Sequence, residues 1–164
     1  MTAVLQDLTK RFQFNSKFVG MLGEGFEPEH WSRKPSDDGG NSAHWILGHL
    51  VVSRRYIVRT LGGDAPDSDW EKEFGRGAQP EDTGGFPAPA ELSAQLEQTD
   101  AELGRLLPEI SEERAASNWS PQGGAFPDGS KSVLGALQFL HFHESYHLGQ
   151  LGLIRRMCGL PGIA

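Results

Sequence analysis

The chain has 164 residues and a single cysteine, and its 22 acidic against 15 basic residues give a formal net charge of −7. This length suits one domain over 1–164, and the acidic balance argues against nucleic acids and anionic membrane surfaces as partners, since both require a basic face. We expect a cytoplasmic protein for three reasons. The chain has a lone cysteine, it shows no basic-plus-apolar leader, and no run approaches the ~20 apolar residues of a membrane span.

Apolar residues recur at three- and four-residue steps in four segments, which is the pattern of amphipathic helices. In chain order these segments are 2–22, 41–61, 89–107 and 131–158. Asn41 or Ser42 is expected to cap the second helix and Ser130 the fourth, because short polar side chains accept hydrogen bonds from the first free amides of a helix. No segment shows the two-residue period of a strand. The sequence therefore predicts an all-α protein, a four-helix bundle of the up-down-down-up type.

Two long irregular loops interrupt the helical pattern. One joins the second and third helices and is rich in Gly and Pro, and the other spans 117–129. The aromatic residues of these loops are Trp70, Phe74, Phe86, Trp119 and Phe126. Such side chains bury much apolar area, so two interpretations stay open: the loops form the rim of a functional cavity, or they only cover the ends of the bundle. A shorter connector at 28–40 carries a turn signal at 37–40.

The fourth helix contains a pair of histidines, His143 and His147, spaced four residues apart. Side chains at that spacing lie one turn apart on the same face, where one metal ion can bind both imidazoles. On a helical wheel the pair falls with the apolar stripe that faces the core, whereas His141 lies on roughly the opposite face. The alternative is that both are core histidines whose ring nitrogens are satisfied by hydrogen bonds.

A metal site needs a third ligand, and His49 is the best placed of the remaining histidines. It shares a face of the second helix with apolar and hydroxyl side chains, which suits a cavity wall. His44 lies about 140° away on that helix and is expected to be solvated or packed against a loop, and His30 to be structural or exposed. His49, His143 and His147 would supply three nitrogens and leave a fourth position open, as in catalytic rather than structural metal sites.

Four more side chains lie near the expected ligands. Gln150, one turn beyond His147, is expected to hydrogen-bond a ligand or to fill a polar hole in the core. Tyr56 and Tyr146 are candidates to donate a hydrogen bond to a substrate, with simple packing as the alternative. Glu144 is expected at the cavity edge or in solvent. The run from His143 to His147 also fits the H-E-x-x-H pattern of zinc proteases, a minor alternative because the chain shows no sheet to hold a substrate.

Several short motifs resemble one known family. Trp45-Ile46-Leu47-Gly48-His49-Leu50 is similar to the W-x-x-x-H-L element of the DinB-like superfamily. The run His143-x-x-x-His147-x-Gly149-Gln150, followed by Arg155-Arg156, resembles its last-helix motif, and the tail Gly159-Leu160-Pro161-Gly162 agrees as well. Leu148 departs from the pattern, since many relatives carry a basic residue there, and this puts a substrate or surface contact in question rather than the metal.

The resemblance implies a four-helix metalloprotein with one divalent ion, Zn²⁺ or Ni²⁺, on the three histidines. Several branches of the superfamily are S-transferases or isomerases that use a low-molecular-weight thiol, which implies such chemistry here on a small electrophile. Two alternatives stay open. One is a hydrolase that uses a metal-activated water, and the other is a non-catalytic metal-binding bundle of a stress response.

The fourth helix also carries an apolar strip on the face away from the ligands. Its residues are Leu134, Leu137 and Leu148, with Gly152 beside them and Gly149 near the edge. An exposed strip of this size is typical of an interface, so together with the frequent dimers of the resembled family it predicts a homodimer. The alternative is that the first or third helix covers the strip within one chain.

Overall fold

The computed structural model describes residues 2–36, 39–75, 78, 87–119 and 125–163. Its helices are α1 (Thr2–Gly23), α2 (Pro28–Ser32), α3 (Ala43–Thr60), α4 (Pro89–Leu106), α5 (Glu112–Ala116) and α6 (Val133–Met157), with 3-10 turns η1 (Asp69–Phe74) and η2 (Leu107–Glu109). Over the described ranges the only β-type pairing consists of two isolated bridges, Ser36 with Gly39 and Asn118 with Ser132. The protein is therefore mainly helical, as the sequence predicts.

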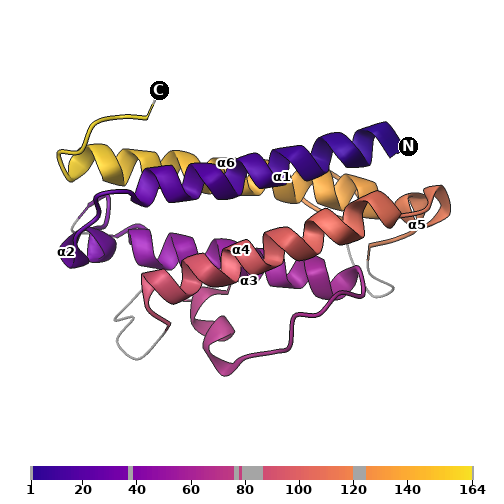
Figure 1. Ribbon diagram of the computed structural model, residues 1–164, viewed down its shortest axis with the longest axis horizontal. Coiled ribbons are helices and arrows are strands. Elements are labelled where there is room, and N and C mark those ends of the chain that lie inside the picture. Colours follow the sequence, from indigo (N-terminus) through magenta and orange to yellow (C-terminus); the bar gives the residue numbers. More distant parts are fainter. Residues whose placement is uncertain (1, 37–38, 76–77, 79–86, 120–124, 164) are drawn as a thin grey trace.

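The four long helices lie along the same axis of the molecule (Figure 1). Contacts join α1 to α6, α3 to α4, α1 to α4 and α3 to α6. The core has two parts, one at each end of the long axis. The first contains Val19 and Leu22 of α1 with Leu148 and Leu151 of α6, and the second contains the earlier part of both helices. Hence α1 and α6 run in the same direction along this axis.

The helix caps explain where two of these helices begin. Ser42 caps α3 by accepting a hydrogen bond from the Trp45 amide, as predicted. The prediction that Ser130 caps α6 is wrong, because Ser132 accepts from the Gly135 amide at 3.1 Å instead. Ser130 is held in the preceding turn, where its hydroxyl donates to the Asp128 carboxylate at 2.7 Å. The helix therefore starts two residues later than that cap would place it.

The predicted connections contain short helical elements of their own. The connector at 28–40 begins with α2, the first long loop contains η1, and α5 lies directly before the second long loop, which was predicted at 117–129. Phe74 of η1 is fully buried and Trp119 is 4% exposed, so these loop aromatics belong to the core. The predicted turn residues Asp37 and Asp38, and the predicted loop aromatic Phe86, lie outside the described residues. None of the helices in the described ranges is long and apolar enough to cross a membrane.

A buried ion network joins the four long helices. Arg54 of α3 donates to both carboxylate oxygens of Glu144 on α6, and Asn15 of α1 donates to the same carboxylate at 3.1 Å. Arg54 also pairs with Asp100 of α4 at 3.2 Å. Glu144 is only 2% exposed, so the prediction that it lies at the cavity edge or in solvent is wrong. Its position is explained by the arginine, because a buried carboxylate needs a cation and hydrogen-bond donors.

Candidate metal centre

Three histidine rings meet between α3 and α6. The Nε2 atom of His143 lies 3.2 Å from Nε2 of His49 and 3.1 Å from Nε2 of His147. One ligand atom from each of the three residues lies within 4.8 Å of the other two. Two nitrogens that each lie about 2.0–2.1 Å from a tetrahedral zinc ion are about 3.3 Å apart. Two of the three nitrogen pairs are therefore spaced like neighbouring corners of one coordination tetrahedron, and the third pair lies within 4.8 Å.

Hydrogen bonds on the far side of two rings fix which nitrogen faces the centre. Nδ1 of His49 lies 2.6 Å from the carbonyl oxygen of Phe74, which can only accept, so Nδ1 carries the proton. Nδ1 of His147 lies 2.8 Å from Oε1 of Gln150, whose amide nitrogen donates to the Tyr146 hydroxyl. In the neutral rings both Nε2 atoms are therefore lone-pair atoms directed at the centre. Gln150 therefore hydrogen-bonds the candidate ligand His147, which is one of the two roles predicted for it.

His143 distinguishes a metal centre from a group of packed core histidines. Its Nδ1 atom is buried and has no hydrogen-bond partner among the described residues. Its Nε2 atom faces two lone pairs, and a single N–H there could satisfy only one of them. The unpartnered Nδ1 atom is common to both interpretations, but packed core histidines would also leave at least one buried Nε2 lone pair unpaired, whereas buried polar atoms are nearly always paired. A cation at the centre would satisfy all three Nε2 atoms, and the donor set fits a divalent ion.

The protonation of the rings also suits metal binding. Burial, together with the neighbouring histidines, lowers the pKa of His143 and of His147 to about 4. Burial lowers the pKa of His49 as well, and the hydrogen bond to Phe74 only partly opposes this. All three imidazoles are therefore neutral near pH 7, which is the form that binds a metal.

Acid is expected to destabilise the metal-free protein. The pKa of an unperturbed histidine is 6.5, whereas the pKa of folded His143 and of folded His147 is about 4. Between these values the unfolded chain binds more protons, so the free energy of unfolding should fall as the pH drops from 6.5 towards 4. Urea unfolding of metal-free protein at several pH values measures this. His143→Gln, which cannot titrate at this position, should lose less stability over the same interval. An equal loss would show that His143 does not cause the acid sensitivity.

A cavity of about 530 Å³ opens above the three rings. It is lined by Trp45, His49, Ser53, Tyr56, Phe126, Pro127, Phe139, Leu140, His143 and His147. Trp45 stacks on the His49 ring with centroids 4.6 Å apart and planes 10° from parallel. The Tyr56 hydroxyl accepts a hydrogen bond from Nε1 of Trp119 at 2.8 Å, which leaves its own proton available to a ligand. Because Phe126 and Pro127 lie in the second predicted loop, that loop forms part of the cavity rim.

The remaining predicted residues lie outside the cluster. His141 is half-buried and meets the Phe12 ring edge-on, so it does not join the other three, as predicted. His44 is buried rather than solvated, and its Nε2 atom bonds the carbonyl oxygen of Pro87, so the loop-packing alternative is confirmed. His30 is structural, because its ring accepts a hydrogen bond from the Glu27 amide. Tyr146 is 57% exposed and is not among the cavity-lining residues.

The turn η1 supports the centre in a way that the sequence reasoning missed. It places the Glu73 carbonyl against Nε1 of Trp45 at 3.1 Å and the Phe74 carbonyl against His49. The Phe74 ring packs directly on Gly48, where any Cβ would overlap it. Glu71 ties the turn to α3 through ion pairs with two arginines. A glycine within a helix, directly before a candidate ligand, is the signal that could have indicated this close approach.

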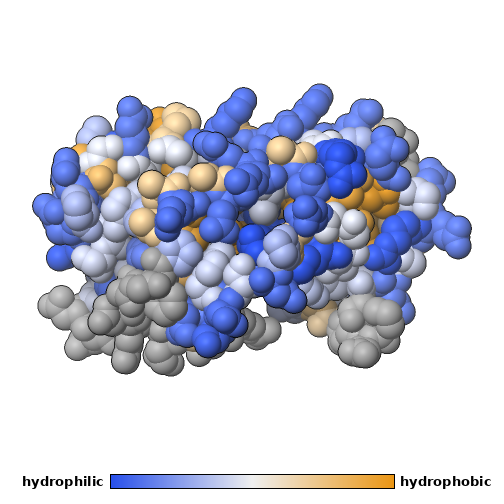
Figure 2. All heavy atoms as spheres, turned by 60° about the horizontal axis from the view of Figure 1, so that its bottom comes forward, coloured by the Kyte–Doolittle hydropathy of each residue, from blue (hydrophilic) through white to orange (hydrophobic). Residues whose placement is uncertain are grey.

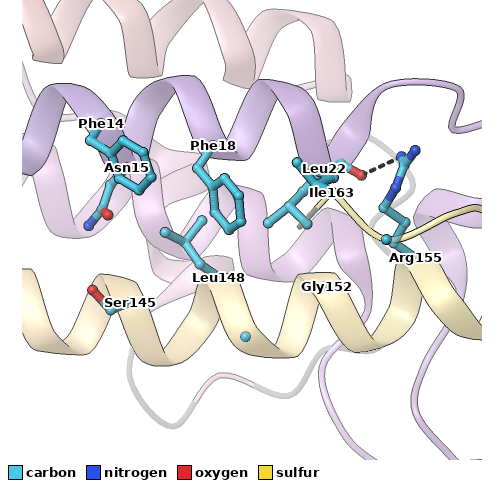
Figure 3. A pocket seen from close by; sticks show the side chains of 11 residues that line it. Phe14, Asn15, Phe18, Leu22, Ser145, Leu148, Gly152, Arg155 and Ile163 are labelled. Atoms are coloured by element: carbon cyan, nitrogen blue, oxygen red, sulfur yellow. Dashed lines mark hydrogen bonds between the residues drawn. The ribbon is translucent and has the colours of Figure 1, made fainter.

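A second hollow lies between α1 and α6, away from the histidines (Figure 3). It measures about 490 Å³, and Phe18 of α1 points into it toward Leu148 of α6. Leu148 is 5% exposed and Leu137 is fully buried. The apolar strip that suggested a dimer is thus covered largely by α1, the alternative considered for it.

Comparison with known proteins agrees with this architecture. A family model described as the DinB superfamily matches residues 21–151. No curated protein matches the chain. Among solved structures, the crystal structure of a DinB-like protein from Bacillus subtilis, YjoA, superposes with a TM-score of 0.65 and 16% sequence identity. The match covers 96% of each chain, and at this identity it shows a shared fold.

Proposed function

The chain belongs to the DinB superfamily, and on that premise we propose that it is a metal-dependent enzyme that activates a low-molecular-weight thiol for reaction with a small electrophile. His49, His143 and His147 are the proposed ligands of one Zn²⁺ or Ni²⁺ ion. The observation that carries the proposal is the convergence of three Nε2 atoms, two of them held as lone pairs by bonds to Phe74 and Gln150. We further propose that the long helices form the family's up-down-down-up bundle.

The chemistry follows from the donor set and the cavity. A divalent ion on three neutral imidazoles keeps a net positive charge and, when bound, ionises a thiol at its open position. The mostly apolar walls reduce the access of water to the sulfur. The thiol proton passes to solvent, the thiolate attacks the electrophilic carbon, and a carbon–sulfur bond forms. The electron pair of the bond that breaks departs with the leaving group in a substitution, or moves onto a neighbouring atom of the substrate in an addition. Tyr56, whose hydroxyl donates to none of the described residues, lines the cavity and can donate a hydrogen bond to the atom that gains this charge.

The position of Glu144 disfavours the hydrolytic alternative. In H-E-x-x-H proteases the glutamate acts as the general base beside the metal. Here Glu144 is buried in its ion pair with Arg54 and does not line the histidine cavity. No acidic side chain lines that cavity among the described residues. The thiol function needs no carboxylate base, because ionisation of the thiol is supplied at the metal.

The proposal can be tested with zinc-loaded protein, a small thiol and an electrophilic probe such as 1-chloro-2,4-dinitrobenzene. Conjugate formation should exceed the uncatalysed rate, fall to background after chelation and return on adding metal. Tyr56→Phe should lower kcat, while His141→Ala should leave it unchanged. Metal-independent turnover would contradict the proposal. Hydrolysis of ester probes without conjugation would favour the hydrolase, and metal binding without either activity would favour the non-catalytic alternative.

We also propose a homodimer, now through a different face of α6. The residues Phe142, Tyr146, Gly149 and Leu153 share one face, and all are exposed. No exposed residue of α6 before Arg156 carries a charge. The face brought forward in Figure 2, by contrast, is largely hydrophilic. The space above Gly149 is open, so a helix from a second copy could approach closely.

Replacing Leu153 with Glu should shift the protein toward the monomer. Leu153 is 54% exposed, so the change should not disturb the fold, but it would place a charge in the proposed interface. Sedimentation velocity at micromolar concentration measures the shift. Gln98→Glu, on an exposed position of α4, is the matched control and should leave the oligomeric state unchanged. Wild-type protein that already sediments as a monomer would contradict the dimer.

A further inference from the structure

We infer, resting on the proposed function, that the cavity above the three histidines selects an uncharged, ring-bearing thiol and discriminates against a thiol with a carboxylate at its far end. The walls of the cavity, rather than the metal, determine this selection.

The first observation is the lack of charge in the cavity wall. Besides the three neutral histidines, two of the described lining residues carry a hydroxyl group, Ser53 and Tyr56. No Asp, Glu, Lys or Arg is among them. A ligand carboxylate held against this wall would lose water without gaining a cation, which is unfavourable.

The second observation is that the nearby cations of α3 are already paired. Arg54 is buried in its ion pair with Glu144, and Arg55 and Arg59 both bind Glu71. On the loop side, Asp128 follows Pro127 in the chain and is exposed. Hydrogen bonds from Ser130 hold the pKa of Asp128 below its usual value, so it is an anion. The α3 arginines are therefore not free to pair with a ligand carboxylate, and the charge of Asp128 would repel one.

The third observation is the aromatic character of the walls. Trp45 lies against the His49 ring, and Phe126 packs on Phe139 with ring centroids 5.3 Å apart. Tyr56, which lines the cavity, is held edge-on by the buried Trp119 behind it. Flat, polarisable walls of this kind bind rings well through stacking and edge contacts. A volume of about 530 Å³ can hold a substituted aromatic ring beside the histidines.

Two thiols of matched shape test the inference. Phenylmethanethiol and 4-(mercaptomethyl)benzoate differ only in a carboxylate at the ring position farthest from the sulfur. Cobalt-substituted protein should develop the ultraviolet absorption of a cobalt-bound thiolate with each, and titration gives a Kd without any turnover. The carboxylate thiol should bind on the order of tenfold or more weaker, because its charge is desolvated without a partner.

A pair of variants at Pro127 separates charge from shape. Pro127 is exposed and lines the rim. Pro127→Lys should recover most of the affinity for the carboxylate thiol, whereas Pro127→Gln, of similar length and without charge, should not. Equal binding of both thiols by the wild-type protein would overturn the inference while leaving the thiol function intact. No absorption change with either thiol, in protein that has bound cobalt, would overturn the thiol function and the inference with it.

Discussion

Replacing His143 with alanine is expected to abolish stoichiometric metal binding. His143 is the central ring of the cluster, with its Nε2 atom 3.2 Å from that of His49 and 3.1 Å from that of His147. Its removal leaves only two of the three proposed ligands, His49 and His147. The loss of affinity should exceed the ~10–100-fold that follows loss of a hydrogen-bond partner behind a ligand. Elemental analysis of dialysed protein and calorimetric titration with Zn²⁺ measure the effect.

His141→Ala is the matched control for this prediction. His141 lies on the same helix and is half-buried, but it packs edge-on against Phe12 and takes no part in the cluster. Its variant should keep one metal ion per chain. Circular dichroism should show that both variants remain helical, since neither position supplies a helix cap. Equal metal content in the two variants would contradict the ligand assignment.

The helices and the three-histidine cluster could be predicted because both depend largely on local geometry. An apolar residue every three to four positions gives a helix one apolar face, whichever neighbour that face later contacts. Accordingly, α1 and α3 begin and end within two residues of their predicted limits. His143 and His147 need only the pitch of one helix to meet. His49 could be added because its position in the second helix leaves it on an inward face. These inferences require no knowledge of which helix packs against which.

The contacts that depend on tertiary packing could not be predicted in this way. Glu144 was expected near solvent, because its partner Arg54 lies 90 residues earlier in the chain. Leu148 was assigned to a free strip because nothing in α6 indicates that α1 runs beside it. The role of η1 depends on a loop that folds back onto α3. In each case the missing information is the identity of the neighbouring element rather than the local conformation.

Gly48 is the residue at which this tertiary contact can be tested most directly, and Gly48→Ala is expected to weaken both the fold and the metal centre. In an unobstructed helix the change would add roughly 1 kcal/mol of stability, since glycine disfavours helix. Here the added Cβ would lie closer than 3.0 Å to the Phe74 ring, which is fully buried and cannot swing into solvent. Overpacking of this kind costs about 1–3 kcal/mol. The free energy of unfolding should therefore fall in Gly48→Ala, although helix propensity alone would raise it.

The metal affinity should fall for a related reason. If the Phe74 ring is displaced, η1 moves with it, and the carbonyl that holds the His49 proton on Nδ1 shifts from its 2.6 Å position. Loss of such an orienting bond costs about 10–100-fold in affinity. Gly20→Ala, in α1 with open space around the new Cβ, should leave metal affinity unchanged and the fold as stable or more so. Zinc titration and urea unfolding of both variants measure these effects. If Gly48→Ala binds zinc as tightly as Gly20→Ala, η1 does not orient His49 for metal binding.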